Sequence, residues 1–152
     1  MTNHIYQVDK NDVPAYWPHM RTWLNAALEK FGTHMRFPID FVLMKLMEGD
    51  YQSWLITQDT VPVGAAVTYI EEYPQGKVLF GFLMGGNNLA TWGDFLHESM
   101  LQYARENNCK WVEVESRRGL GRHYYERLGY KKRYETYTLE VSYMGGGGPS
   151  GQ

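Results

Sequence analysis

A turn rich in glycine and asparagine that leads into a helix holds the residues best suited to chemistry in this sequence. Residues 77–84 are almost uniformly apolar, as expected of a buried strand. Gly85–Asn88 follow as a turn, and an amphipathic helix is predicted over Thr91–Asn107. A helix N-terminus presents N–H groups without partners and a partial positive charge, which together suit a phosphate. The backbone of residues 91–93 is therefore a candidate phosphate site.

The same residues also have a purely structural interpretation. Thr91 is a good helix N-cap, and Asp94 is a favourable first-turn charge that would itself repel a phosphate. The side chain of Trp92 could fill the site. Both interpretations remain open on the sequence alone.

Metal chemistry is not expected. The single cysteine, Cys109, is interpreted as a small buried hydrophobe. The five histidines do not have the spacing of metal ligands on one helix face; they are His4, His19, His34, His97 and His123.

The elements that position this turn alternate between helices and strands, which predicts an α+β fold with a mixed sheet and helices on both faces. The first helix is expected to restart at Pro18, since a proline deep in a helix lacks the N–H for a helical hydrogen bond. Helices are predicted over residues 13–30, 38–48 and 91–107, and a short one ends at Leu128-Gly129. Strands are predicted over residues 5–8, 51–57, 62–72, 77–84 and 110–115, with one or two more over 130–141.

Composition limits the class of protein. The 152 residues suit one domain, predicted over residues 1–144, and the glycine-rich tail of residues 145–152 has little to pack. The net charge of −2 gives no general attraction to nucleic acid or membranes. No apolar run is long enough to span a membrane, and the N-terminus does not resemble a signal peptide. A cytoplasmic protein, or one assembled into a particle inside a cell, is expected.

Two motifs, together with the order of elements, resemble the GNAT acetyltransferase superfamily over residues 5–141. Tyr125–Tyr130 reads Tyr-Glu-Arg-Leu-Gly-Tyr and is similar to the family's Tyr-Glu-Lys-Leu-Gly-Phe. Residues 88–93 align with its Arg/Gln-x-x-Gly-x-Gly/Ala loop, where Gly93 matches the last position. Asn88 stands in place of Arg or Gln, and Thr91 in place of the first Gly.

The resemblance implies a central mixed sheet of about six to seven strands, splayed at the fourth and fifth, and acetyl-CoA-dependent N-acetylation of an unidentified amine. Acetyl-CoA would lie at the splay, with its acetyl and pantetheine groups on the backbone of Leu83. The resemblance places Tyr125 as the general acid, whereas the structural alternative is a core tyrosine. The general base is left open between Glu71, Glu72 and a water chain. The residues placed around the cofactor are Leu83, Asn88, Thr91, Trp92 and Gly93.

The departures from the family motifs support a second hypothesis. Degenerate GNAT-like domains of this kind resemble proteins of tailed bacteriophages, so the chain could be a catalytically silent structural or adaptor subunit of a virion, with protein subunits as partners. Residues 117–133 contain seven basic residues and one acidic residue. They could contact CoA phosphates or an acidic protein surface. Nucleic acid is not the expected partner, because no recognition motif accompanies the basic residues.

Overall fold

The computed structural model describes residues 2–30, 33–115, 120–133 and 137–141. The chain divides into two compact units, Met1–Ser116 and Arg117–Gln152. The first unit contains the sheet and the helices α1 to α3, and the second contains α4. The single-domain prediction for residues 1–144 stays a prediction, and the glycine-rich tail lies outside the described residues.

Helices and strands alternate much as the sequence predicts. The strands are β1 Asn3–Val8, β2 Tyr51–Gln58, β3 Val61–Tyr73, β4 Gly76–Gly86 and β5 Cys109–Val114. The helices are α1 Val13–Lys30, α2 Ile39–Glu48, α3 Leu89–Glu106 and α4 Leu120–Arg127, with a 3₁₀ turn at Thr33–Met35.

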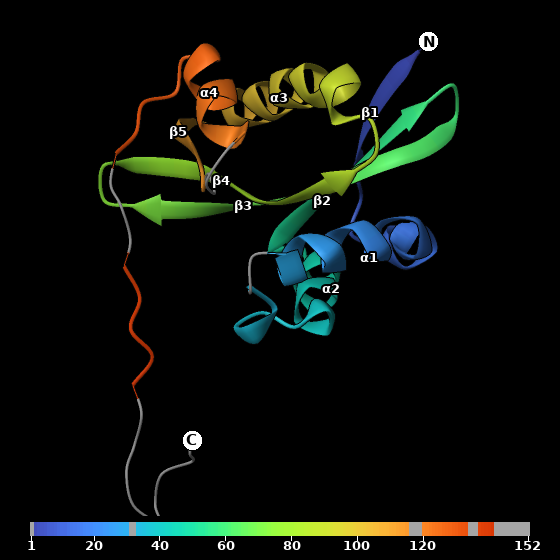
Figure 1. Ribbon diagram of the computed structural model, residues 1–152, viewed down its shortest axis with the longest axis horizontal. Coiled ribbons are helices and arrows are strands. Elements are labelled where there is room, and N and C mark those ends of the chain that lie inside the picture. The colour runs from blue at the N-terminus through green and yellow to red at the C-terminus, as the bar shows by residue number, and fades with distance from the viewer. Residues whose placement is uncertain (1, 31–32, 116–119, 134–136, 142–152) are drawn as a thin grey trace, which may run out of the picture. The chain divides into compact units, whose positions relative to one another are not determined.

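The five strands form one mixed sheet in the order β1-β2-β3-β4-β5. β1 to β4 are antiparallel neighbours, whereas β5 pairs parallel to β4 because α3 carries the chain back across the sheet. In Figure 1, α1 and α2 lie on one face of this sheet and α3 lies on the other. The described residues thus form an α+β fold with helices on both faces, as predicted.

Each face of the sheet has its own apolar core. Leu24, Val42 and Val67 belong to the core between the sheet and α1 and α2, and all three are fully buried. Leu79 and Trp92 belong to the core beneath α3 and are likewise fully buried. Alternate residues of β3 and β4 therefore point to different cores, as the two-residue period of a strand requires.

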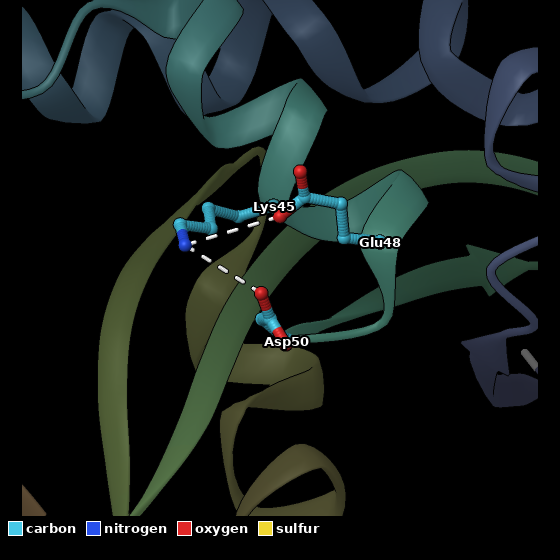
Figure 2. A network of polar contacts seen from close by, with 3 residues as sticks. All are labelled: Lys45, Glu48 and Asp50. Atoms are coloured by element: carbon cyan, nitrogen blue, oxygen red, sulfur yellow. Dashed lines mark hydrogen bonds and ion pairs between the residues drawn. The ribbon is translucent and has the colours of Figure 1, made fainter.

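The end of α2 is fixed by a left-handed glycine and a small ionic network. Gly49 has φ +88°, and its N–H donates to the carbonyl of Leu46, which ends the helix. The Nζ atom of Lys45 lies 3.9 Å from Glu48 Oε1 and 3.5 Å from Asp50 Oδ2 (Figure 2). The turn delivers the chain directly into β2 at Tyr51.

Two expectations differ from the structure. The helix α1 continues through Pro18 without a restart, since tertiary burial of its apolar face outweighs the lost hydrogen bond. The described residues form five strands, so the expected count of six to seven is not confirmed. Residues 130–133 and 137–141 form no strand, while residues 134–136 lie outside the described residues.

A glycine on β3 makes room for the tryptophan of α3. A Cβ atom at Gly64 would lie 2.5 Å from Cζ2 of Trp92. We therefore expect Gly64→Ala to lower the free energy of unfolding by about 1–3 kcal/mol through overpacking, as measured by urea denaturation.

The double variant Gly64→Ala/Trp92→Phe provides the control, because the smaller ring removes the atoms that the new methyl group meets. Its destabilisation should be less than the sum of the two single changes. Strictly additive free energies would show that the two side chains do not compete for space.

Candidate functional site

The central feature of the candidate site is a bulge in β4. Val67 of β3 pairs with Leu83, and the next residue, Thr68, pairs with Gly81, which leaves Phe82 as the extra residue. Phe82 and Leu83 consequently both pack toward the core under α1 and α2. A bulge increases the local twist and bends its strand away from a neighbour.

The pairing between β4 and β5 ends where the bulge begins. The last pair is Gly81 with Val114. Among the described residues, β4 continues to Gly86 with β3 as its sheet neighbour. Polar backbone groups at the β5 side of residues 82–86 are thus placed to receive a ligand, as an unpaired strand edge is. The Leu83 side chain is buried, so this residue would contribute its backbone.

The helix α3 starts immediately after this open stretch of β4. Asn88, with φ +60° and ψ +37°, makes the left-handed turn, and α3 begins at Leu89. The N–H of Thr91 donates to the carbonyl of Asn88 at 2.8 Å, and its hydroxyl donates to the same oxygen at 2.6 Å. Because the first N–H groups of a helix have no helical acceptor, those of Leu89 and Ala90 are directed toward an external acceptor.

A buried amide holds this helix start to the edge of the sheet. The Nε2 atom of Gln58 donates to Thr91 Oγ1 at 2.7 Å and to Asn3 Oδ1 at 2.9 Å. Asn3 in turn donates from Nδ2 to the carbonyl of Thr91 at 3.0 Å. The hydrogen bonds of Thr91 therefore hold the start of α3 against β1 and β2. Sequence analysis missed Gln58 and Asn3, because their partners lie 33 or more residues away.

Trp92 and Gly93 are buried under the helix start. The indole Nε1 of Trp92 donates to the carbonyl of Asn87 at 2.7 Å, and its ring packs beside Gly64 and Gly86. Trp92 is 0% exposed, so it lies beneath the first turn of α3 as an anchor. Gly93 is in the second turn, where a helical N–H donates to the carbonyl four residues earlier.

The two candidate bases lie on opposite faces of β3. A carboxylate oxygen of Glu72 lies 3.9 Å from Lys77 Nζ. The charge of Glu71 instead adds to the effect of burial in raising the pKa of Tyr51 and of Tyr69. Glu71 is four residues from Val67, the partner of Leu83, which corresponds to roughly 13 Å along the strand. Neither carboxylate is therefore beside the bulge.

The second unit carries Tyr125. The short helix α4 ends where the motif predicts, with Gly129 at φ +97° and the N–H of Tyr130 donating to the carbonyl of Tyr125. The ring of Tyr125 lies 5.4 Å from those of Tyr124 and Tyr130. Burial raises the pKa of Tyr125 above its usual value, so its hydroxyl carries a proton at neutral pH. The general-acid role stays a prediction.

Two further properties concern the described residues as a set. Nowhere in them do three or more His, Cys, Asp or Glu side chains come together as a group that could hold a metal ion. None of the helices in them is long and apolar enough to cross a membrane. The predicted basic segment is described only in part, and within it Arg127 lies 5.2 Å from the ring of Tyr124.

We expect Gln58→Leu to destabilise the protein by about 1–3 kcal/mol, because the change removes two part-buried hydrogen bonds, to Thr91 and to Asn3. Urea denaturation measures this free energy. Gln102→Leu is the matched control, since Gln102 is exposed and bonds only locally to Glu106 among the described residues. Equal effects of the two changes would contradict a structural role for Gln58.

Comparison with known proteins identifies the fold. No family model and no curated protein matches the sequence. A GCN5-related N-acetyltransferase from Ralstonia eutropha has a similar structure, with a TM-score of 0.70 and 14% identity over 91% of this chain and 99% of that chain. An aminoglycoside N-acetyltransferase in complex with CoA has a TM-score of 0.67 and 16% identity, over 92% and 95% of the two chains.

A predicted acetyltransferase from Clostridium acetobutylicum, determined with acetyl-CoA, has a TM-score of 0.64 and 15% identity, over 91% of this chain and 96% of that chain. These similarities show that this chain has the fold of the GNAT acetyltransferases. Sequence identities this low leave the chemistry to be argued from the residues.

Proposed function

We propose that this GNAT-fold protein is an acetyl-CoA-dependent N-acetyltransferase that transfers the acetyl group directly to an amine. One observation carries the proposal: the β4–β5 pairing ends at Gly81, next to the bulge at Phe82 and just before the N-terminus of α3. Open strand backbone and a helix N-terminus therefore follow one another within residues 82–90. An extended amide chain that ends in a pyrophosphate needs both kinds of donor.

Acetyl-CoA is the acetyl donor in this proposal. Its pyrophosphate would accept hydrogen bonds from the N–H groups of Leu89 and Ala90. Asn88 makes the turn, while Thr91, Trp92 and Gly93 hold that turn in place. The amide groups of the pantetheine chain would bond to the β4 backbone near Leu83. The site uses mainly backbone donors, which explains how side chains of the family loop can differ here without loss of binding.

The reaction is a direct displacement. The amine nitrogen attacks the thioester carbonyl, the new N–C bond forms, and the C–S bond breaks. Backbone N–H groups near Leu83 polarise the carbonyl oxygen as negative charge develops on it. Tyr125 would protonate the departing thiolate, since its phenol carries a proton at neutral pH. The amine loses its proton through water, since Glu71 and Glu72 are distant from Leu83.

Ala90→Glu tests the cofactor site directly. Ala90 is exposed in the first turn of α3, where a carboxylate favours the helix but repels a pyrophosphate. We expect acetyl-CoA binding, measured by thermal shift or calorimetry, to weaken about 10-fold or more, the equivalent of about 1.4 kcal/mol. Ala90→Gln has nearly the same size without the charge, and should bind within about 3-fold of the unchanged protein.

A saturable acetyl-CoA effect that is equal in both Ala90 variants would place the cofactor elsewhere. The absence of any effect up to millimolar acetyl-CoA would contradict the proposed activity. The fold would then serve a catalytically silent protein, such as the structural or adaptor subunit considered from the sequence.

Tyr125→Phe tests the general acid. Loss of a positioned proton donor should lower kcat about 10²-fold or more while leaving acetyl-CoA binding nearly unchanged. Tyr124→Phe is the matched control, because it removes the same hydroxyl from the adjacent position. Release of free thiol measures turnover, and a reduction of kcat by similar factors in both variants would contradict a specific role for Tyr125.

A further inference from the structure

A carboxylate stands where β5 ends, across from the open edge of β4. Gly81 of β4 pairs with Val114, which is the last residue of β5. Glu115 follows Val114 directly and is exposed, so it is level with the bulged residue Phe82. Because neighbouring strands lie about 4.8 Å apart, this carboxylate is within side-chain reach of the β4 backbone near Leu83.

The Glu115 side chain belongs to the sheet face that carries α1 and α2 (Figure 1). Glu113 pairs with Phe80, and Glu115 follows two residues later, so the two glutamates share a face. Burial is the main cause that raises the pKa of Tyr69 to about 12, and the charge of Glu115 adds to it. The ring of Tyr69 lies 5.8 Å from that of Phe82. Glu115 thus acts on the same group of side chains as the bulge.

Other carboxylates near this edge are less well placed. The strand β4 itself contains none. Glu71 is roughly 13 Å along β3 from the partner of Leu83. Glu113 lies two residues, or roughly 6–7 Å, before Glu115, and it has an interaction of its own. No basic side chain in the described part of the chain lies within ion-pair distance of Glu115. Its charge is therefore available to a ligand at the bulge.

We propose that Glu115 holds the ammonium group of the acetyl acceptor beside the bulge and accepts the proton that this nitrogen must lose before it attacks. The inference rests on the proposed N-acetyltransferase function and adds a residue to it. Alkylamines are mainly protonated at neutral pH, and an ammonium ion has no lone pair with which to attack a carbonyl. An exposed carboxylate attracts that ion and supplies a base at the same place.

The proton transfers balance over one turnover. The ammonium group gives one proton to the Glu115 carboxylate, and the free amine then attacks the thioester carbonyl. After the N–C bond has formed, the nitrogen loses its second proton through water. The C–S bond breaks, and the departing thiolate is protonated as described above. Glu115 returns its proton to solvent, so the reaction releases one proton in total.

Ethylamine and 2,2,2-trifluoroethylamine separate proton transfer from folding and from cofactor binding. Both are short primary amines, but at neutral pH ethylamine is mainly protonated and the fluorinated amine mainly is not. We measure kcat/KM of the full chain with acetyl-CoA from thiol release. Glu115→Gln should lower kcat/KM about 10²-fold for ethylamine, because the base is lost. For trifluoroethylamine, kcat/KM should stay within about 3-fold of the unchanged protein.

Glu71→Gln is the matched control, because it removes the same charge from the same face at a greater distance from Leu83. Both glutamates are exposed, so both variants should fold, as thermal denaturation will verify. Glu71→Gln should leave both amines within about 3-fold of the unchanged protein. An equal loss for the two amines in Glu115→Gln would overturn the inference, as would an equal loss from Glu71→Gln.

The pH dependence gives a readout that a merely structural role would not change. With ethylamine, kcat/KM of Glu115→Gln should rise more steeply with pH than that of the unchanged protein, because only the free amine reacts in the variant. The titratable groups on this face near Glu115 are Tyr69, Glu71 and Glu113. In the described residues, α1 and α2 place no basic group within ion-pair distance of it. These groups are the same in both proteins, so parallel pH profiles would contradict the inference.

Glu115→Lys tests the position without an added acceptor. The new amine would take the place of the substrate, so acetyl-CoA at alkaline pH should acetylate the side chain at position 115. Peptide mass spectrometry measures the rate, which should be at least about 10-fold higher than at position 71 in Glu71→Lys, because of proximity. If the unchanged protein turns over neither amine, this comparison decides, and equal rates at the two positions overturn the inference.

Tyr69 provides a measurement that needs no acetyl-CoA. Removal of a nearby negative charge favours the phenolate, so Glu115→Gln should lower the pKa of Tyr69. Ring-carbon NMR of labelled tyrosine follows this titration, and Tyr69→Phe assigns the signal. A Tyr69 pKa that is the same in both proteins would show that Glu115 does not reach this face, which overturns the inference.

The two proposals fail in distinguishable ways. If acetyl-CoA binds and Ala90→Glu weakens it, but Glu115→Gln affects both amines equally, the role of Glu115 is wrong and the acetyltransferase proposal stands. If acetyl-CoA does not bind, the acetyltransferase proposal fails and the role of Glu115 fails with it, even where Glu115→Gln lowers the pKa of Tyr69.

Discussion

The single extra residue in β4 is the constraint on which the rest of this structure depends. Because Phe82 has no place in the β3 register, Phe82 and Leu83 both face the α1 and α2 core. The strand bends there, and pairing with β5 ends at Gly81. Since β5 itself ends at Val114, the backbone of β4 beyond the bulge has no strand on its β5 side among the described residues.

The start of α3 depends on a different kind of interaction, which is packing of one large ring against backbone. Trp92 fits only because Gly64 has no side chain, and its indole bonds to the carbonyl of Asn87 in the turn itself. Gln58 adds a polar connection from β2 to Thr91. The exposed N–H groups at Leu89 and Ala90 are therefore held by buried contacts, so that little ordering is required when a ligand binds.

The two faces of the bulge differ in character. Along the open edge of β4 and at the start of α3 there are backbone donors and a helix N-terminus, which suit an anion. Toward α1 and α2 there are the stacked rings of Tyr51, Tyr69 and Phe80. The fold alone does not support an assignment of ligands, since one architecture hosts many functions. The backbone donors beside the bulge are what make the binding of an anionic acetyl donor there physically reasonable.

Periodicity in the sequence was sufficient for most of the fold. Alternating and continuous apolar runs located β1 to β5 within a few residues, and the Tyr125–Tyr130 motif located the end of α4. The same approach predicted strands over residues 130–141 that the described residues there do not form. Alternation in a sequence shows that a segment suits a sheet, but not that a neighbouring strand pairs with it.

The candidate site, like the fold, could be predicted only in part from the sequence. The sequence by itself located the turn between β4 and α3 and the tyrosine motif, because both depend on local residue types. Only the tertiary structure decided that Phe82 is a bulge, that Trp92 points inward, and that Glu71 and Glu72 face opposite ways. Strand register is set by pairing with distant residues, and a shift of one residue reverses every side chain beyond it.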